Sequence, residues 1–548
     1  MKRIYYLSFL LLPLILVITA IFLNHARGPY WLGTNLDPEY VYLLNSTNLA
    51  NLKGVGHIDH PGTPVQVLGA VTLRVVYFFN FSAKDNFHTD VLKRPEYYLK
   101  AINIVMVILN AIMLLALGGF TFMLMGNIWL SLWLQLAPFF SITVLQFGLT
   151  RVTPEPLLFF SSTAMVLMMV FLVHLDAAAN KKRALIILLH LMAFITAFGI
   201  ANKITFIPMM AIPLIILPRL RNKVIYLAVA VVGFVICTLP IIRMYPRFFE
   251  WIYNLLTHSG QYGSGSSKLI AAGKYIKNLM QLIFNNPFFS IVLVLALVIV
   301  MTGLLIPKLR NISTSNIHFK CLAAAAAAQL AGLLMVSKHS ASHYLLPALS
   351  LSGATVVFIF FYLKHVLDHF NIIIKYLVFP LLFFLTVSFI LINPPGQFKK
   401  TIHRLNNIKE KSLALHQHVK DNYKDYAKIF YYRSSSPEYA LKFGNDLSRS
   451  YHSQGLEQLY ENVYFYDIWT KRFAGFDYNR SIPFKTIREK YGNKILFQGT
   501  RGVKIPGLKL KPVFDNGAYE RATIPIFDLP RRHEEKKKNR GLKISLLY

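Results

Sequence analysis

Hydrophobic residues form long uninterrupted runs along this chain, and short polar segments separate the runs. Several runs exceed the roughly 18 apolar residues that a helix needs to cross the hydrocarbon core of a bilayer. Twelve runs are candidates: 4–23, 65–81, 101–125, 128–147, 156–175, 184–200, 204–218, 224–242, 287–306, 319–336, 344–363 and 375–393. The pattern predicts a mainly α-helical, polytopic membrane protein.

Short basic segments decide which runs cross the membrane, because cytoplasmic loops carry an excess of Lys and Arg. The segments are 2–3, 181–183, 219–223 and 308–310. All four fall on the cytoplasmic side only if the run 65–81 does not cross. That run contains Arg74 and lies between Pro61, Pro64 and a polar segment, so we expect a helix in the membrane interface. The prediction is about 11 transmembrane helices with a cytoplasmic N-terminus and an extracytoplasmic C-terminus.

A change in composition divides the chain into a membrane region, 1–395, and a soluble region, 396–548. The membrane region includes the first external loop, 24–100, in which we expect interfacial helices. The soluble region mixes charged, polar and aromatic residues and contains strand-like segments at 429–433 and 463–467. We therefore expect a C-terminal extracytoplasmic α/β domain.

Net charge changes this picture little. The formal charge is +33, but much of it lies in the short loops and in the C-terminal tail of a chain with mean hydropathy +0.45. Such charge is typical of membrane topology and of attraction to membrane lipids, and we expect no nucleic-acid partner. The two cysteines, Cys237 and Cys321, both lie inside apolar runs and imply no disulfide framework.

Candidate chemistry begins directly after the first run. Asp37 and Glu39 lie on either side of Pro38, which keeps Asp37 out of a helix interior. One interpretation is a helix cap with Pro38 at the first helical position. The other, compatible with the first, is a carboxylate at the membrane edge that accepts a proton from a substrate hydroxyl.

A second cluster follows in the same loop. In an extended segment His57 and Asp59 point one way and His60 the other. This spacing suits a metal or a phosphate contact, although the sequence fixes no third or fourth ligand. The alternative is a polar loop stiffened by Pro61 and Pro64.

Charged residues also lie in short connections between later runs. Arg151 and Glu155 are either an interfacial ion pair or groups that face a polar cavity, because charge at membrane depth is costly. Lys203 is either a functional cation or a lysine that extends to the interface.

A later turn adds cationic and titratable groups. The segment from Lys338 through His339 and His343 to Tyr344 lies at the external end of two runs. Its side chains suit a phosphate oxyanion held near the bilayer. The alternative is an ordinary surface turn.

Five motifs in this order resemble the GT-C superfamily of polyprenyl-phosphate-sugar-dependent glycosyltransferases, which includes protein O-mannosyltransferases and lipid A aminoarabinose transferases. The similarity covers about residues 1–360. The motifs are the acidic pair Asp37 and Glu39, the turn His60-Pro61-Gly62-Thr63-Pro64, Arg151 with Glu155, Gly199 with Lys203, and His343-Tyr344-Leu345-Leu346-Pro347. The chain departs from the family where proline interrupts the acidic pair, glycine replaces the second proline after His60, and glutamate stands at 155.

The resemblance implies a multi-pass protein of the bacterial inner or plasma membrane that transfers a sugar from a polyprenyl-phosphate donor to a glycan, lipid or protein acceptor. Asp37 would be the general base in one displacement with inversion. Arg151, Lys203 and Lys338 would stabilise the phosphate. A divalent cation (Mg, Mn or Zn) held by Glu39 or His57 is left open.

Two other classes fit parts of the pattern. A transporter or flippase for a lipid-linked substrate would place charges along the span centres and would contain repeated halves, whereas the charges here gather on one membrane face. An oligosaccharide polymerase or ligase usually has its large polar loop between later spans.

Overall fold

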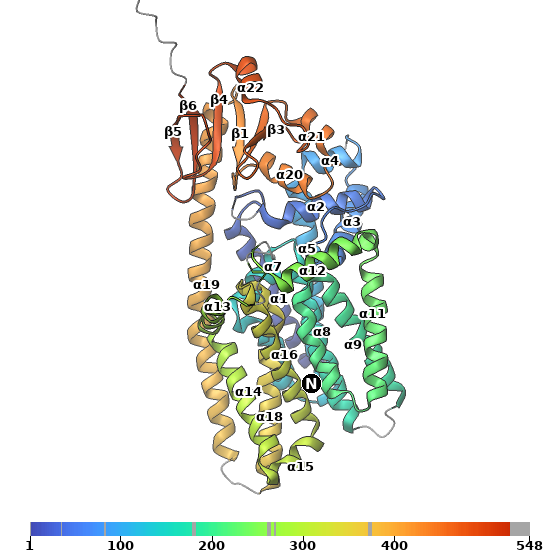
Figure 1. Cartoon of the computed structure of the whole chain (residues 1–548). Helices are drawn as coiled ribbons and strands as arrows, with labels where there is room; N and C mark the ends of the chain where they lie inside the picture. The colour runs from blue at the N-terminus through green and yellow to red at the C-terminus, as the bar shows by residue number, and fades with distance from the viewer. Residues whose placement is uncertain are drawn as a thin grey trace, which may run out of the picture.

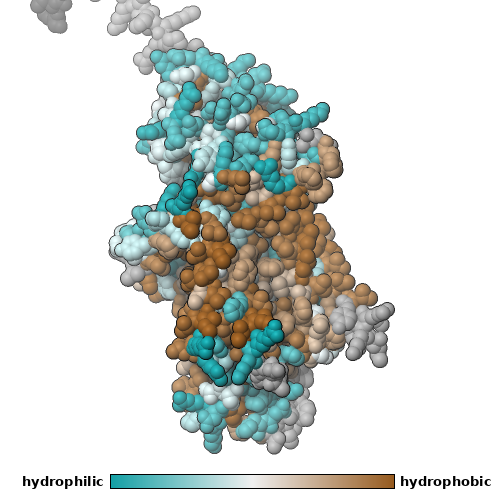
Figure 2. Space-filling model, turned by 90° about the vertical axis from the view of Figure 1, so that its right-hand side faces the viewer, coloured by the Kyte–Doolittle hydropathy of each residue, from teal (hydrophilic) through white to brown (hydrophobic). Residues whose placement is uncertain are grey.

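The protein forms a tall helix bundle with a smaller sheet-containing domain at one end (Figure 1). This computed structural model describes residues 2–33, 36–81, 84–177, 182–259, 265–267, 270–370 and 375–526, and of these it leaves out the side chains of 2–6, 36–37, 177 and 375–394. On the visible face, apolar side chains form a broad band across the bundle, and hydrophilic side chains cover both ends (Figure 2). This distribution is that of a multi-pass membrane protein.

Within the described residues, eight helical segments are long and apolar enough to cross a membrane. They belong to α1 (Lys2–Arg27), α5 (Pro95–Met125), α8 (Pro154–Ala177), α9 (Lys182–Asn202), α11 (Leu220–Cys237), α14 (Pro287–Leu305), α16 (Ile317–Lys338) and the stretch of η5 (Ser342–Leu345), α17 (Leu346–Ser350) and α18 (Ser352–His369). The predicted polytopic helical fold is confirmed.

Three predicted spans take other forms. The run 128–147 becomes α6 (Ile128–Leu136), η1 (Ala137–Phe140) and α7 (Ile142–Thr150), bent by 82°. The bend falls at Ser141, which caps the restarted helix α7, and Pro138 lies in η1 just before it, where proline cannot donate a helical hydrogen bond. The run 204–218 forms the shorter pair η2 (Ile204–Met210) and α10 (Ala211–Ile216). The run 375–393 is the start of α19 (Lys375–Asn422), and its side chains lie outside the described residues.

The run 65–81 forms α3 (Thr63–Phe78), whose 16 residues are too few for a span. Val67, Val71 and Val75 are exposed along one side of α3, and its other side packs on α2 (Leu36–Ala50). The Arg74 guanidinium on α3 would be costly inside a bilayer. It donates two hydrogen bonds to the Ala50 carbonyl at the end of α2, at 2.6 and 3.0 Å.

Two further amphipathic helices, α12 (Tyr245–Thr257) and α13 (Ala272–Asn285), lie between α11 and α14 in the chain. Their apolar stripes, which include Phe249 and Tyr253 on α12 and Ile276 and Met280 on α13, are exposed. Such helices favour the membrane interface.

The C-terminal domain is built on one mixed sheet in the order β3-β2-β1-β4-β6-β5. The strands are β1 (Ala427–Tyr431), β2 (Val463–Asp467), β3 (Arg472–Ala474), β4 (Ile495–Thr500), β5 (Leu510–Asp515) and β6 (Glu520–Pro525). β1 pairs in parallel with β2 and β4, and the remaining pairs are antiparallel. The connections between strands contain the short helices α20 (Pro437–Asp446), α21 (Ser453–Leu459) and α22 (Phe484–Tyr491). The predicted α/β fold of this region is confirmed.

No break separates the bundle from this domain along the chain. α19 continues from Lys375 to Asn422, so the predicted boundary at 395/396 falls inside one helix. The domain also shares a hydrophobic core with the first loop, in which Tyr40 and Leu44 of α2 pack with Leu441 of α20 and Phe465 of β2. α2 is therefore held between the bundle and the sheet. A second contact joins the short helix α4 (Phe87–Lys93) of the same loop to α21.

The basic segments lie together at the other end of the bundle. α8 ends and α9 begins there, and α15 (Pro307–Ser315), which carries Lys308 and Arg310, lies there as well (Figure 1). α11 ends near α3, since Thr63 Oγ1 donates to the Cys237 carbonyl at 2.8 Å, and so it begins at the far end. The candidate site and the basic segments occupy opposite ends, as the charge pattern predicts.

Candidate functional site

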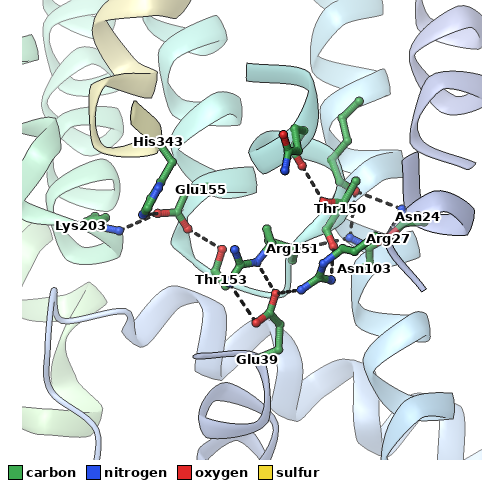
Figure 3. Close-up of polar contacts among 12 residues, drawn as sticks. Asn24, Arg27, Glu39, Asn103, Thr150, Arg151, Thr153, Glu155, Lys203 and His343 are labelled. Carbon is green, nitrogen blue, oxygen red and sulfur yellow. Dashed lines mark hydrogen bonds and ion pairs between the residues drawn. The ribbon is translucent and has the colours of Figure 1, made fainter. Parts of the chain in front are cut away.

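Polar side chains from several helix ends meet near Glu39 of α2 (Figure 3). Arg27 is the last residue of α1, Glu155 lies in the first turn of α8, Lys203 directly follows α9, and His343 lies in η5. Glu39, on α2, completes the cluster. The bundle thus brings together residues that are far apart in the chain, at the level where its spans end.

Glu39 is fully buried and binds two guanidinium groups. Its Oε1 accepts from both Arg27 and Arg151, and its Oε2 accepts from Arg151 Nη2 at 3.1 Å. One carboxylate therefore faces two fixed cations. Guanidinium groups fixed in this way can donate to a carboxylate and to a phosphate group alike.

Backbone carbonyls fix the two arginines. Arg27 Nη1 donates to the Thr150 carbonyl at 2.8 Å. The amide of Asn103, on α5, donates to the carbonyls of Leu149 and Arg151 at 3.0 and 3.3 Å. These bonds hold the turn between α7 and α8 and so set the position of Arg151.

A second ion pair lies beside the first. Lys203 Nζ donates to Glu155 Oε1 at 2.6 Å, and Thr153 Oγ1 donates to Glu155 Oε2. His343 Nε2 is 4.0 Å from the same carboxylate and its ring stacks on Phe147. Arg151 and Glu155, which the sequence suggests as an ion pair with each other, thus form ion pairs with Glu39 and Lys203.

His60 joins the second pair through aromatic contacts. Its ring meets Trp251 of α12 edge-on, with centroids 5.2 Å apart, and lies 6.0 Å from the Tyr344 ring. Lys203 Nζ lies 4.3 Å from the centroid of that same Tyr344 ring. Burial, together with the nearby Lys203 cation, lowers the pKa of His60 well below its usual value, so the ring is neutral at pH 7.

His57 and Asp59 precede this contact in the loop. His57 is buried with its ring edge-on to Tyr42, and burial lowers its pKa although Asp59 opposes the shift. The expected strict alternation is interrupted, since His60 has a φ of 79°. The backbone turns here, and the His60 ring lies against α12 and η5.

The first two residues of the turn at the end of α16, Lys338 and His339, contact α12 and not the charged cluster. Lys338 Nζ donates to the Leu256 carbonyl and His339 Nε2 lies 3.4 Å from the Leu255 carbonyl, both near the end of α12. Cations at a helix C-terminus stabilise its free carbonyls. These two predicted site residues hold α12 in place, while His343 and Tyr344 lie within the cluster.

Asp37, the predicted base, belongs to the first turn of α2, and its side chain lies outside the described residues. Its backbone position is two residues before Glu39. The role assigned to Asp37 stays a prediction.

Arg27 was missed by reasoning from the sequence. Its signal is a basic residue at the end of the first span opposite to the basic segments, where the distribution of charges predicts few cations. Trp251 was missed as well, because α12 carries no polar motif.

A divalent cation held by Glu39 or His57 stays a prediction. Both oxygens of Glu39 already accept from guanidinium groups. No group of three or more His, Cys, Asp or Glu residues that could hold a metal ion occurs among the described residues. We therefore assign no chemical step to a metal ion.

The side chains of the two networks include three fixed cations, Arg27, Arg151 and Lys203, and two carboxylates, Glu39 and Glu155. The fold and this cluster define a multi-pass membrane protein with a largely buried site of charged side chains at the end of its spans. Such a site can bind an anion whose remaining part lies in the bilayer.

Comparison with known proteins gives one structural likeness. The chain is similar to the crystal structure of ArnT from Cupriavidus metallidurans bound to undecaprenyl phosphate, with a TM-score of 0.49, 11% identity, and coverage of 94% of this chain and 97% of that one. No protein-family model matches the chain, and no curated protein matches it.

Proposed function

We propose that this protein is a membrane glycosyltransferase that moves a sugar from a polyprenyl-phosphate donor to an acceptor at the membrane surface. The observation that carries the proposal is the meeting of three cations, Arg27, Arg151 and Lys203, at the end of the spans. Guanidinium and ammonium groups at the edge of an apolar bundle are donors that can bind an anionic lipid headgroup. The order of motifs that resembles the GT-C superfamily supports the same reaction.

The proposed site faces the extracytoplasmic side. The support is the gathering of the basic segments at the opposite end of the bundle, because short cytoplasmic loops are rich in Lys and Arg. The lipid donor then enters from the outer leaflet, and the C-terminal domain lies outside the membrane on the same side.

The proposed reaction is one displacement. The Asp37 carboxylate accepts the proton of the acceptor hydroxyl, whose oxygen attacks the anomeric carbon, and the bond from that carbon to the phosphate oxygen breaks with inversion. Polyprenyl phosphate leaves with the electron pair. Arg151 and Lys203 stabilise its developing charge, and Glu39 and Glu155 position these two cations.

The test is transfer by the Asp37→Asn variant, assayed in detergent or nanodiscs with a radiolabelled polyprenyl-phosphate sugar. We expect transfer to fall by two to four orders of magnitude, roughly the contribution of a positioned general base. Donor binding should remain, because the cations are intact. The substitution keeps the size and shape of the side chain and removes its basicity, so transfer at the wild-type rate would refute the role of Asp37.

A further inference from the structure

The C-terminal domain contains a cleft that the proposed reaction does not use. It lies where β1 and β2 end and is bordered by α20, with a volume of about 280 Å³. Its lining includes Tyr432, Lys442, Asp446, Asp467, Trp469 and Tyr478. Ligands of α/β domains commonly bind at the carboxyl ends of parallel strands, and ligand pockets start at roughly 300 Å³.

Aromatic rings form the open side of this cleft. The Trp469 residue is 72% exposed and Tyr478 is 47% exposed. Trp469 meets Tyr432 edge-on with centroids 5.3 Å apart. Large aromatic surfaces exposed together on a folded domain mark binding sites, because they lose contact with water when a ligand covers them.

One carboxylate holds the backbone of Trp469 and the ring of Tyr478. Asp467, the last residue of β2, accepts from the backbone N–H of Trp469 at 2.8 Å and from the Tyr478 hydroxyl at 3.2 Å. The turn that carries Trp469 and the Tyr478 ring are therefore positioned before a ligand arrives, which lowers the entropy cost of binding.

The charges of the cleft balance. Lys442 Nζ donates to Asp446 Oδ2 at 2.5 Å and lies 5.0 Å from the Tyr478 ring centroid. Burial raises the pKa of Asp446 to about 6, so its carboxylate is ionised at pH 7 and accepts hydrogen bonds. Lys442 and Arg472 face Asp446 and Asp467, so the lining has no net charge in a chain of formal charge +33. An anionic ligand gains nothing from this balance.

We propose that this cleft binds a neutral saccharide, with a sugar ring packed on Trp469 and Tyr478 and its hydroxyls donating to Asp446 and Asp467. A saccharide presents an apolar C–H face and a rim of hydroxyls, and this combination matches aromatic walls with carboxylate acceptors. The proposal that the cleft binds a saccharide is argued from the lining of the cleft alone. The further idea that this saccharide is the acceptor of the transfer reaction rests on the proposed function.

Two packed helices, α20 and α2, connect the cleft to the membrane site. Lys442 and Asp446 of α20 face the cleft, while Gly444 of the same helix approaches the Tyr40 carbonyl of α2 so closely that a Cβ there would be 2.6 Å from the oxygen. Tyr40 is adjacent to Glu39. The cleft and the membrane site are thus linked through the contact of α20 with α2.

The experiment uses the full-length protein in nanodiscs, first on an array of neutral and acidic glycans and then in titrations with the neutral glycans that are retained. Trp469→Ala should weaken their binding about tenfold or more, as expected for loss of an aromatic anchor, whereas Trp469→Phe should keep most of the affinity. Tyr451→Ala removes an exposed aromatic outside the cleft on the same domain and should leave binding unchanged.

Three results would overturn the inference: no glycan is retained, acidic glycans are preferred, or Trp469→Ala binds as tightly as the wild type. Binding by the Asp37→Asn variant separates this inference from the proposed function. We expect that variant to bind the neutral glycan with unchanged affinity, and loss of its binding would contradict a separate site. If Asp37→Asn retains transfer, the proposed base is wrong while the cleft is unaffected.

Discussion

Replacement of Lys203 by methionine tests whether the ion pair with Glu155 is structural, functional or both. Both side chains are about 95% buried, and Nζ lies 2.6 Å from Oε1. Methionine keeps much of the aliphatic length of lysine and removes the charge. The variant leaves the Glu155 carboxylate buried with the neutral Thr153 hydroxyl and a His343 ring 4.0 Å away.

The distance between Lys203 Nζ and Glu155 Oε1 sets the size of the expected loss of stability. Coulomb's law with an effective dielectric constant of about 20 gives about 6 kcal/mol for unit charges at this distance. The cost of desolvating the two groups offsets part of this attraction, and loss of one partner from a buried pair costs roughly 3–5 kcal/mol. We expect Lys203→Met to be destabilised by that amount. The double variant Lys203→Met/Glu155→Gln removes the unpaired charge and should regain most of it.

Stability and transfer are measured on the wild type, the two single variants and the double variant, by thermal unfolding in detergent and by transfer of a labelled sugar. If Lys203 stabilises the phosphate, the double variant recovers stability but not transfer, whereas Glu155→Gln alone keeps the cation and retains measurable transfer. Recovery of transfer together with stability in the double variant would refute a functional Lys203. A single Lys203→Met variant as stable as the wild type would refute the buried-pair reasoning.

Further predictions concern the contacts between the first external loop and the C-terminal domain, and whether transfer needs a divalent cation. His88 and His452 share a hydrogen bond of 2.8 Å, and burial lowers both pKa values, that of His452 to about 3, so the unfolded chain binds more protons below pH 6.5. Stability is therefore greatest above pH 6.5. Between pH 6.5 and 5 it should fall by about 2 kcal/mol through His452 and further through His88, and by less in His452→Gln, as thermal melts across pH will measure. Gly444→Ala places a Cβ against the Tyr40 carbonyl and should cost about 1–3 kcal/mol in the same melts. Transfer should persist in EDTA, since Glu39 already binds two guanidinium groups; its complete loss, restored by Mg²⁺, would contradict this.

The membrane fold was predictable because each span needs a long apolar run, and the charge pattern then distinguished α3 from a span. The angle of the bend between α6 and α7 could not be predicted from the sequence. Pro138 signals a break in the helix, but the 82° turn depends on packing against residues distant in sequence. The continuity of α19 through Pro394, Pro395 and Gly396 was also missed, since these residues ordinarily end helices.

The candidate site was predictable as a set of residues and not as a set of pairs. Glu39, Arg151, Glu155 and Lys203 stand out because charge at the end of a span is costly unless it is satisfied. Which cation binds which carboxylate depends on how α2 meets the turn between α7 and α8 and on how α8 packs on α9, and no local pattern encodes these contacts. Arg27 shows this limit, since its importance comes from the carboxylate of Glu39, which lies beyond a turn on a different helix.

The position of α2 couples the two regions of the molecule. Its Glu39 binds the arginines of the bundle, and the next residue, Tyr40, packs in a core shared with α20 of the C-terminal domain. Asn45 and Asn48, also on α2, donate to the carbonyls of Leu447 and Ser448 just beyond α20 at 3.1 and 3.0 Å. A displacement of α20 therefore moves the carboxylate that positions Arg27 and Arg151. Because packed interfaces shift between discrete arrangements and do not deform smoothly, we expect changes at the α20–α2 contact to alter transfer more than they alter donor binding.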